Sequence, residues 1–196
     1  MLFNIYLALL GLCFVASFRK IFLKNFLWAY FLYVIIIEVL VNFFSVKDYL
    51  YIYSILVYIS YFFFFYAKKT NSKAVVAISF VSFLFSFYFI VSSNQVESYN
   101  INAGISLSIF YILISLLWFY KNFSKTDRKI HHKIGFWVSS SLLLWGVAFI
   151  FRIIPMEFFN IKDKEFLLVI TQLYQSFTIL SYGVFLSGIL YSKSDE

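Results

Sequence analysis

Charged residues are scarce in this chain. Only 13% of its 196 residues are Asp, Glu, Lys or Arg, whereas 63% are apolar, against about 25% and 45–50% in an ordinary soluble domain. This composition excludes a water-soluble globule. The single proline and the six glycines exclude a collagen-like, linker-like or disordered chain. The single cysteine, Cys13, excludes an internal disulfide framework.

Apolar residues instead gather in long runs, each close to the ~20 residues that an α-helix needs to cross a bilayer. The runs lack the alternating pattern of a membrane β-strand, and backbone polar groups must be paired within hydrocarbon, so each run is predicted to be a helix. The chain is thus expected to be an all-α membrane protein, with residues 1–196 forming a single seven-helix transmembrane domain. The expected spans are 1–18, 26–44, 49–67, 74–92, 101–120, 134–152 and 166–191.

The positive charges predict how the spans are oriented, because cytoplasmic loops retain Lys and Arg. Of the 16 such residues, 12 fall after spans one, three, five and seven, and 4 fall after spans two and six. We therefore expect the N-terminus outside and the C-terminus in the cytoplasm. The connections between the spans are too short for a folded extramembrane domain.

The net charge of +7 needs no nucleic acid to explain it, because the basic cytoplasmic face can lie against the anionic headgroups of membrane lipids. The abundance of Phe, Ile, Asn, Lys and Tyr is typical of an AT-rich genome. We expect a multi-pass protein of a bacterial cytoplasmic (inner) membrane.

One polar stripe lies inside the second span. Glu38, Asn42 and Ser45 follow each other at helical spacing. An ionised carboxylate at that depth costs several kcal/mol unless it has a partner. Glu38 is therefore either a protonated or hydrogen-bonded link between helices, or a site for a ligand, an ion or a proton, or exposed at the outer interface. Arg152, at the outer end of span six, is its candidate partner for an ion pair, although it could also reach the headgroups alone.

Span seven has two faces of interest. Thr171, Gln175, Thr178 and Tyr182 recur at helical spacing, which indicates either interhelical hydrogen bonds or the wall of a polar cavity. A second face carries the small residues Ser176, Gly183 and Ser187, which would let another helix approach closely. Gln172 lies between these faces.

Milder stripes in the other spans are predicted to be packing seams rather than cofactor sites. They are Asn4, Ala8 and Gly11; Tyr51, Ser54, Tyr58 and Tyr61; Ser79, Ser82 and Ser86; Gly104, Ser108, Tyr111 and Ser115; and Gly135, Ser139 and Gly146.

Catalytic and metal-binding patterns are not recognisable in the sequence. His131 and His132 are adjacent in a basic loop and lack other ligands at metal-binding spacing. Cys13 has no histidine nearby that could activate it. We expect neither an enzyme nor a protein with a cofactor.

The sequence therefore favours a sensor, a receptor-like protein or an accessory subunit that binds an apolar or lipid-like ligand or a membrane partner protein. The alternative is a small transporter or channel with Glu38 as its proton or ion site. The candidate binding residues, all in the expected outer half, are Glu38, Asn42, Arg152, Gln172 and Gln175. Assembly into a homo-oligomer is left open.

Overall fold

Helices make up nearly all of the structure. The computed structural model describes residues 2–19, 25–43, 49–92, 101–123, 130–155 and 163–192, and these parts of the chain contain no β-strand. A short 3₁₀ helix, η1 (Ile130–His132), precedes α7. The seven α-helices are α1 (Leu2–Ala16), α3 (Leu27–Phe43), α4 (Tyr49–Thr70), α5 (Lys73–Ser92), α6 (Ile101–Phe123), α7 (Ile134–Ile153) and α8 (Lys164–Tyr191).

Each helix lies within a few residues of a span expected from the sequence, so the predicted all-helical class is confirmed. Five of the described helices, α4 to α8, are long and apolar enough to cross a membrane. The other two, α1 and α3, are apolar but have only 15 and 17 residues. The structure thus supports a multi-pass membrane protein.

Local chemistry explains where individual helices begin and end. Asp163 is the N-cap of α8, where its Oδ1 accepts hydrogen bonds from the backbone N–H groups of Glu165 (2.9 Å) and Phe166 (3.3 Å). The last turn of α4 contains Lys68 and Lys69, whose positive charges are favourable at a helix C-terminus. Asn71, directly after the helix, has a φ of 42°, which turns the chain into α5.

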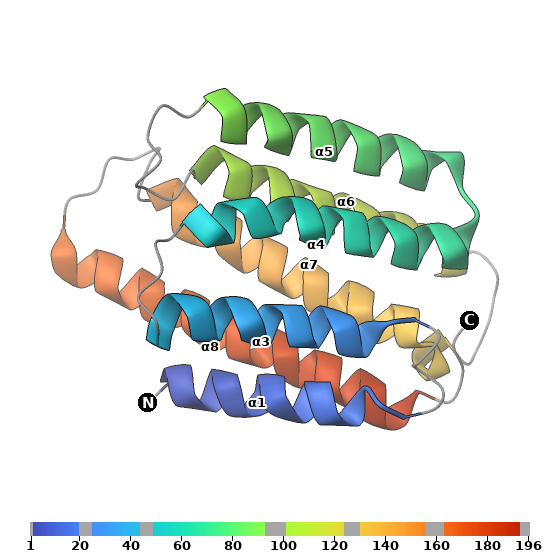
Figure 1. Ribbon diagram of the computed structural model, residues 1–196, viewed down its shortest axis with the longest axis horizontal. Helices are drawn as coiled ribbons and strands as arrows, with labels where there is room; N and C mark the ends of the chain where they lie inside the picture. The colour runs from blue at the N-terminus through green and yellow to red at the C-terminus, as the bar shows by residue number, and fades with distance from the viewer. Residues whose placement is uncertain are drawn as a thin grey trace.

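Six of the helices form a closed ring. Around it, α1 packs on α3, followed by α4, α6, α7 and α8, and α8 returns to α1. Helix α5 lies outside this ring against α4 and α6, at the edge of the bundle in Figure 1. The helices run alternately in the two directions, so the two chain ends lie at opposite ends of the bundle (Figure 1). We call these the N-terminal end and the C-terminal end.

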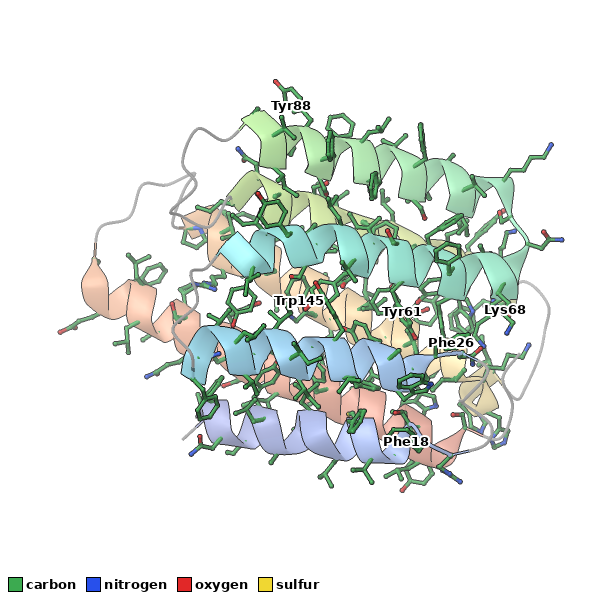
Figure 2. All side chains as sticks on the ribbon, viewed as in Figure 1. Phe18, Phe26, Tyr61, Lys68, Tyr88 and Trp145 are labelled. Atoms are coloured by element: carbon green, nitrogen blue, oxygen red, sulfur yellow. The ribbon has the colours of Figure 1, made fainter. Side chains whose placement is uncertain are left out.

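Large apolar side chains cover the outside of the bundle. On α5 the exposed residues include Phe80, Leu84, Phe85 and Tyr88, and Tyr88 projects away from the other helices in Figure 2. An apolar surface of this extent is not compatible with water. It suits contact with lipid tails, which agrees with the membrane assignment.

Small residues hold the helices of the ring together. A Cβ on Gly135 of α7 would lie 2.6 Å from Nε1 of Trp118 on α6, and one on Gly146 would lie 3.0 Å from the backbone oxygen of Ser108. On α5, which packs on the outside of the ring, the serines predicted to form a seam are also buried: Ser79, Ser82 and Ser86. The packing seams predicted for spans four and six are therefore confirmed. In span five the seam is confirmed for Gly104, Ser108 and Ser115, which are buried, whereas Tyr111 lines a cavity.

Two predicted seams are wrong. Asn4 and Ala8 of α1 are exposed, and a Cβ on Gly11 would have no neighbour within 4 Å. A Cβ on Gly183 of α8 would likewise have no neighbour within 4 Å, although we expected another helix to pack on this face. The close approach on α8 is at Gly188, which packs against Trp137 of α7. Small residues mark a possible contact, but the neighbouring helices decide which of them is used.

Candidate ligand-binding cavity

A cavity of about 520 Å³ lies inside the ring of six helices. All six ring helices contribute to its wall, whereas none of its lining residues comes from α5. On α3 the lining runs from Tyr30 to Asn42, a distance of roughly 18 Å at the helical rise of 1.5 Å per residue. The cavity thus extends from the N-terminal end towards the middle of the bundle. Its volume is typical of sites for small molecules.

Aromatic side chains form most of the deep wall. Trp145, labelled near the middle of the bundle in Figure 2, stacks on Phe149 with 5.3 Å between ring centroids. It also meets Tyr111 edge-on at 5.5 Å. Further lining aromatics are Tyr6, Tyr30, Tyr58, Tyr174, Tyr182 and Phe185. Such a wall offers apolar faces together with hydroxyl groups at ring edges.

Glu38 lies in this wall and accepts hydrogen bonds from side chains of three helices. The hydroxyl of Tyr6 on α1 donates to Oε1 at 2.9 Å, and the hydroxyl of Tyr51 on α4 donates to Oε2 at 3.1 Å. The amide of Asn42, one turn along α3, donates to Oε2 at 3.0 Å. We call Tyr6, Glu38, Asn42 and Tyr51 the Glu38 cluster. It links α1, α3 and α4 beside the cavity.

Arg152 lies in the same cavity wall but in different surroundings. Its guanidinium carbon is 5.0 Å from the centroid of the Tyr174 ring, a cation–π contact between α7 and α8. Its Nε is buried and makes no hydrogen bond within the described residues. The predicted ion pair between Glu38 and Arg152 is not formed. Phenol and amide donors satisfy the carboxylate instead, and an aromatic face holds the guanidinium.

Four of the five predicted binding residues line the cavity: Glu38, Asn42, Arg152 and Gln175. Asn42 and Gln175 are also exposed, so the cavity is open where they lie. Gln172 is exposed and is not part of the wall.

The polar face predicted on span seven is largely a cavity wall. Gln175, Thr178 and Tyr182 line the cavity, while Thr171 does not. The hydroxyl of Thr178 donates to the backbone oxygen of Tyr174 in its own helix (2.9 Å) rather than to a neighbouring helix. Of the two interpretations left open by the sequence, this geometry supports the cavity.

Sequence reasoning missed several residues of the site. Tyr51 was in a recognised stripe on span three, but its bond to Glu38 could not be foreseen without knowing how α3 and α4 face each other. Tyr6 and Tyr174 carried no signal, because tyrosine is common throughout the chain, with 16 copies.

The chemistry of this wall is suited to binding. It combines one carboxylate, one guanidinium, two amides and several phenols around an apolar interior. Among the described residues, no group of three or more His, Cys, Asp or Glu side chains could hold a metal ion. The sequence matches no protein-family profile, and no curated protein or solved structure is significantly similar to it.

Proposed function

We propose that this protein is a receptor-like or accessory membrane protein that binds a small amphipathic molecule in the central cavity. The observation that carries the proposal is the cavity itself, which has the size of a small-molecule site, a largely aromatic wall and a few polar groups at one end. A lipid-like molecule with a polar head fits that distribution of chemistry.

The alternative is a small transporter or channel with Glu38 as the proton or ion site. The Glu38 cluster favours binding over this alternative, because three donors hold the two carboxylate oxygens in place. A carboxylate has room for about four hydrogen bonds, so little capacity is left for a transported cation. Helices interrupted by proline or glycine, which are common around transported substrates, are not found among the described helices.

We further propose that all seven helices cross the bilayer, with the N-terminus outside, in a bacterial cytoplasmic membrane. Helices α1 and α3 run beside the longer helices along the bundle (Figure 1), and both are apolar. Of the described basic residues, six lie towards the C-terminal end: Arg19, Lys68, Lys69, Lys73, Lys121 and Lys133. Only Arg152 and Lys164 lie towards the other end, so the positive-inside rule assigns the C-terminal end to the cytoplasm. The cavity would then open on the outer side.

The test is native mass spectrometry of the protein in lipid nanodiscs, with one variant that fills the cavity. Thr178 lines the cavity and bonds only within its own helix, so Thr178→Trp should occupy the space with little other change. We expect a small molecule on the wild type that is lost from this variant.

Thr171→Trp is the matched control. Thr171 lies on the same helix and makes the same type of bond, to the backbone oxygen of Leu167 at 2.9 Å, but it is outside the cavity wall. This variant should retain the ligand. Equal occupancy in both variants, or no bound molecule on the wild type, would contradict the proposal. A stoichiometric protein partner without a bound small molecule would favour the accessory role alone.

A further inference from the structure

Arg152 is the one charged group of the cavity wall whose hydrogen-bonding capacity is unused among the described residues. It lies in the last turn of α7. Its buried Nε has no hydrogen-bond partner there, and its guanidinium lies over the face of the Tyr174 ring. An aromatic face stabilises the charge of a guanidinium but accepts none of its five N–H groups in hydrogen-bond geometry.

Glu38 provides the contrast. Its carboxylate accepts three hydrogen bonds from α1, α3 and α4, whereas Arg152 stands on the wall formed by α7 and α8. The carboxylate of Glu38 is therefore bonded within the protein, whereas the guanidinium of Arg152 lies in the cavity wall without such bonds. A buried polar group without a partner is costly, and an acceptor on a ligand would satisfy Arg152.

The planar guanidinium matches the two oxygens of a carboxylate. Charge favours this anion over a phosphate monoester, because a carboxylate brings one negative charge and a phosphate monoester brings about 1.5 to 2, while Arg152 supplies a single positive charge and Glu38 is already present. Beside Arg152, the rings of Tyr174, Phe149 and Trp145 are in mutual contact, with 5.9 Å between the first two centroids and 6.3 Å between Tyr174 and Trp145. They form an apolar surface next to the cation.

We propose that Arg152, held over Tyr174, binds the carboxylate of an amphipathic monocarboxylic acid whose apolar body lies against Phe149 and Trp145. This inference rests on the proposed function and specifies the ligand class of the same cavity. It makes Tyr174 a positioning residue, because its ring fixes where the guanidinium lies.

The experiment compares three compounds of nearly equal shape: 4-phenylbutyrate, 4-phenylbutan-1-ol and 4-phenylbutylamine. Dissociation constants are measured by calorimetry on wild-type protein in nanodiscs, and empty nanodiscs correct for partition into lipid. We expect the carboxylate to bind at least tenfold more tightly than the alcohol, and the amine to bind most weakly. This comparison requires no variant, so it does not depend on how well a substitution folds.

Variants then assign the preference to one side chain. Arg152→Gln should weaken binding of the carboxylate by about tenfold to a hundredfold, the range for loss of a charge-assisted hydrogen bond, and should change the alcohol by less than about twofold. Tyr174→Leu should weaken the carboxylate several-fold, because the guanidinium loses its support. Lys73→Gln, which removes one positive charge from an exposed residue at the opposite end, should change neither.

The possible failures can be told apart. If the alcohol or the amine binds the wild type as tightly as the carboxylate, or if Arg152→Gln weakens all three compounds equally, the inference about the anion is overturned and the proposed function stands. If none of the three binds, the inference about the anion is overturned, and the proposed function is decided by whether native mass spectrometry finds a molecule that Thr178→Trp displaces.

Discussion

At the scale of single residues, the most informative position is Glu38. A carboxylate inside a membrane protein needs charge or hydrogen-bond donors around it, and a lysine or arginine is the partner that sequence inspection suggests first. The protein uses two phenols and an amide instead, at 2.9–3.1 Å. These donors come from three helices, so the acid connects α1, α3 and α4 without neutralising Arg152. That arrangement leaves the guanidinium available to a ligand.

Removing the carboxylate should therefore loosen the bundle. We expect Glu38→Ala to lower the free energy of unfolding by about 1–3 kcal/mol, because the Tyr6, Asn42 and Tyr51 donors lose an acceptor at once. Tyr51→Phe removes a single donor and should cost only about 0.5–1.5 kcal/mol. Denaturant unfolding in detergent micelles, followed by circular dichroism, measures both.

The control for these variants is Tyr88→Phe, which removes a hydroxyl from an exposed ring on α5 and should leave the stability unchanged. If Glu38→Ala unfolds with the same free energy as Tyr88→Phe, the Glu38 cluster does not stabilise the ring.

At the scale of helices, glycine allows close packing at some positions and has no packing role at others. Gly135 and Gly188 lie where a neighbouring tryptophan leaves no room for a Cβ, whereas Gly11 and Gly183 face open space. Glycine lowers intrinsic helix stability at all four positions. Only at the first pair does close packing compensate for that cost.

We expect Gly135→Ala to lower the free energy of unfolding by about 1–3 kcal/mol, the usual cost of overpacking. Its new methyl group would lie 2.6 Å from the buried Trp118 side chain. Gly183→Ala should instead be neutral or stabilise the protein by up to about 1 kcal/mol. The two variants are compared by the same unfolding measurement. If Gly183→Ala also lowers the free energy of unfolding, the face of α8 that carries Gly183 is closely packed, and the prediction is wrong.

These glycines also show how far the sequence could be read. Helix positions were predictable because charges and polar clusters interrupt the apolar runs, as Lys68 and Lys69 do at the end of α4. The rotation of each helix about its own axis was not predictable, because a membrane helix is apolar on both its buried and its lipid-facing side. Phe62 is fully buried, for example, and Phe64, two residues later, is 69% exposed. The small-residue stripes of α1 and α8 therefore looked the same as the true seams of α6 and α7.

The site was predictable to the same degree. Rare polar residues within spans, such as Glu38 and Gln175, identified the cavity wall because a polar side chain at membrane depth requires a reason. Gln172 met the same criterion, but its side chain is exposed and does not line the cavity. The tyrosines of the site were hidden by their abundance, since only the assembled ring shows which of them meet.

At the scale of the whole molecule, the two ends of the bundle have different chemistry. The N-terminal end holds the cavity, lined by all six ring helices. At the C-terminal end, the guanidinium of Arg19 donates to the last backbone oxygens of α8, those of Ile189 (2.8 Å) and Leu190 (3.0 Å). Helices α1 and α8 are thus joined at that end by Arg19 and border the cavity at the other, where the rings of Tyr6 and Tyr182 meet at 5.2 Å. A ligand that shifts α1 relative to α8 at the cavity would therefore also change their contact at the C-terminal end.

This arrangement has a functional direction only if the two ends face different compartments, which cysteine labelling of intact cells can test. Cys13 is the only cysteine, and it is buried, so a Cys13→Ser background allows single cysteines to be placed at exposed positions. Asn102 and Lys73 are both exposed, and they lie near opposite ends of the bundle, at the start of α6 and of α5 (Figure 1).

We expect Asn102→Cys to react with a membrane-impermeant maleimide in intact cells, and Lys73→Cys to react only after permeabilisation. The physical reason is the excess of Lys and Arg at the C-terminal end, which should keep that end in the cytoplasm. The reverse pattern would place the cavity mouth inside the cell, so the ligand would have to be an intracellular molecule. Reaction of both cysteines in intact cells would mean that α5 does not cross the bilayer. Positions 73 and 102 lie on either side of α5, so a crossing α5 would place them in different compartments.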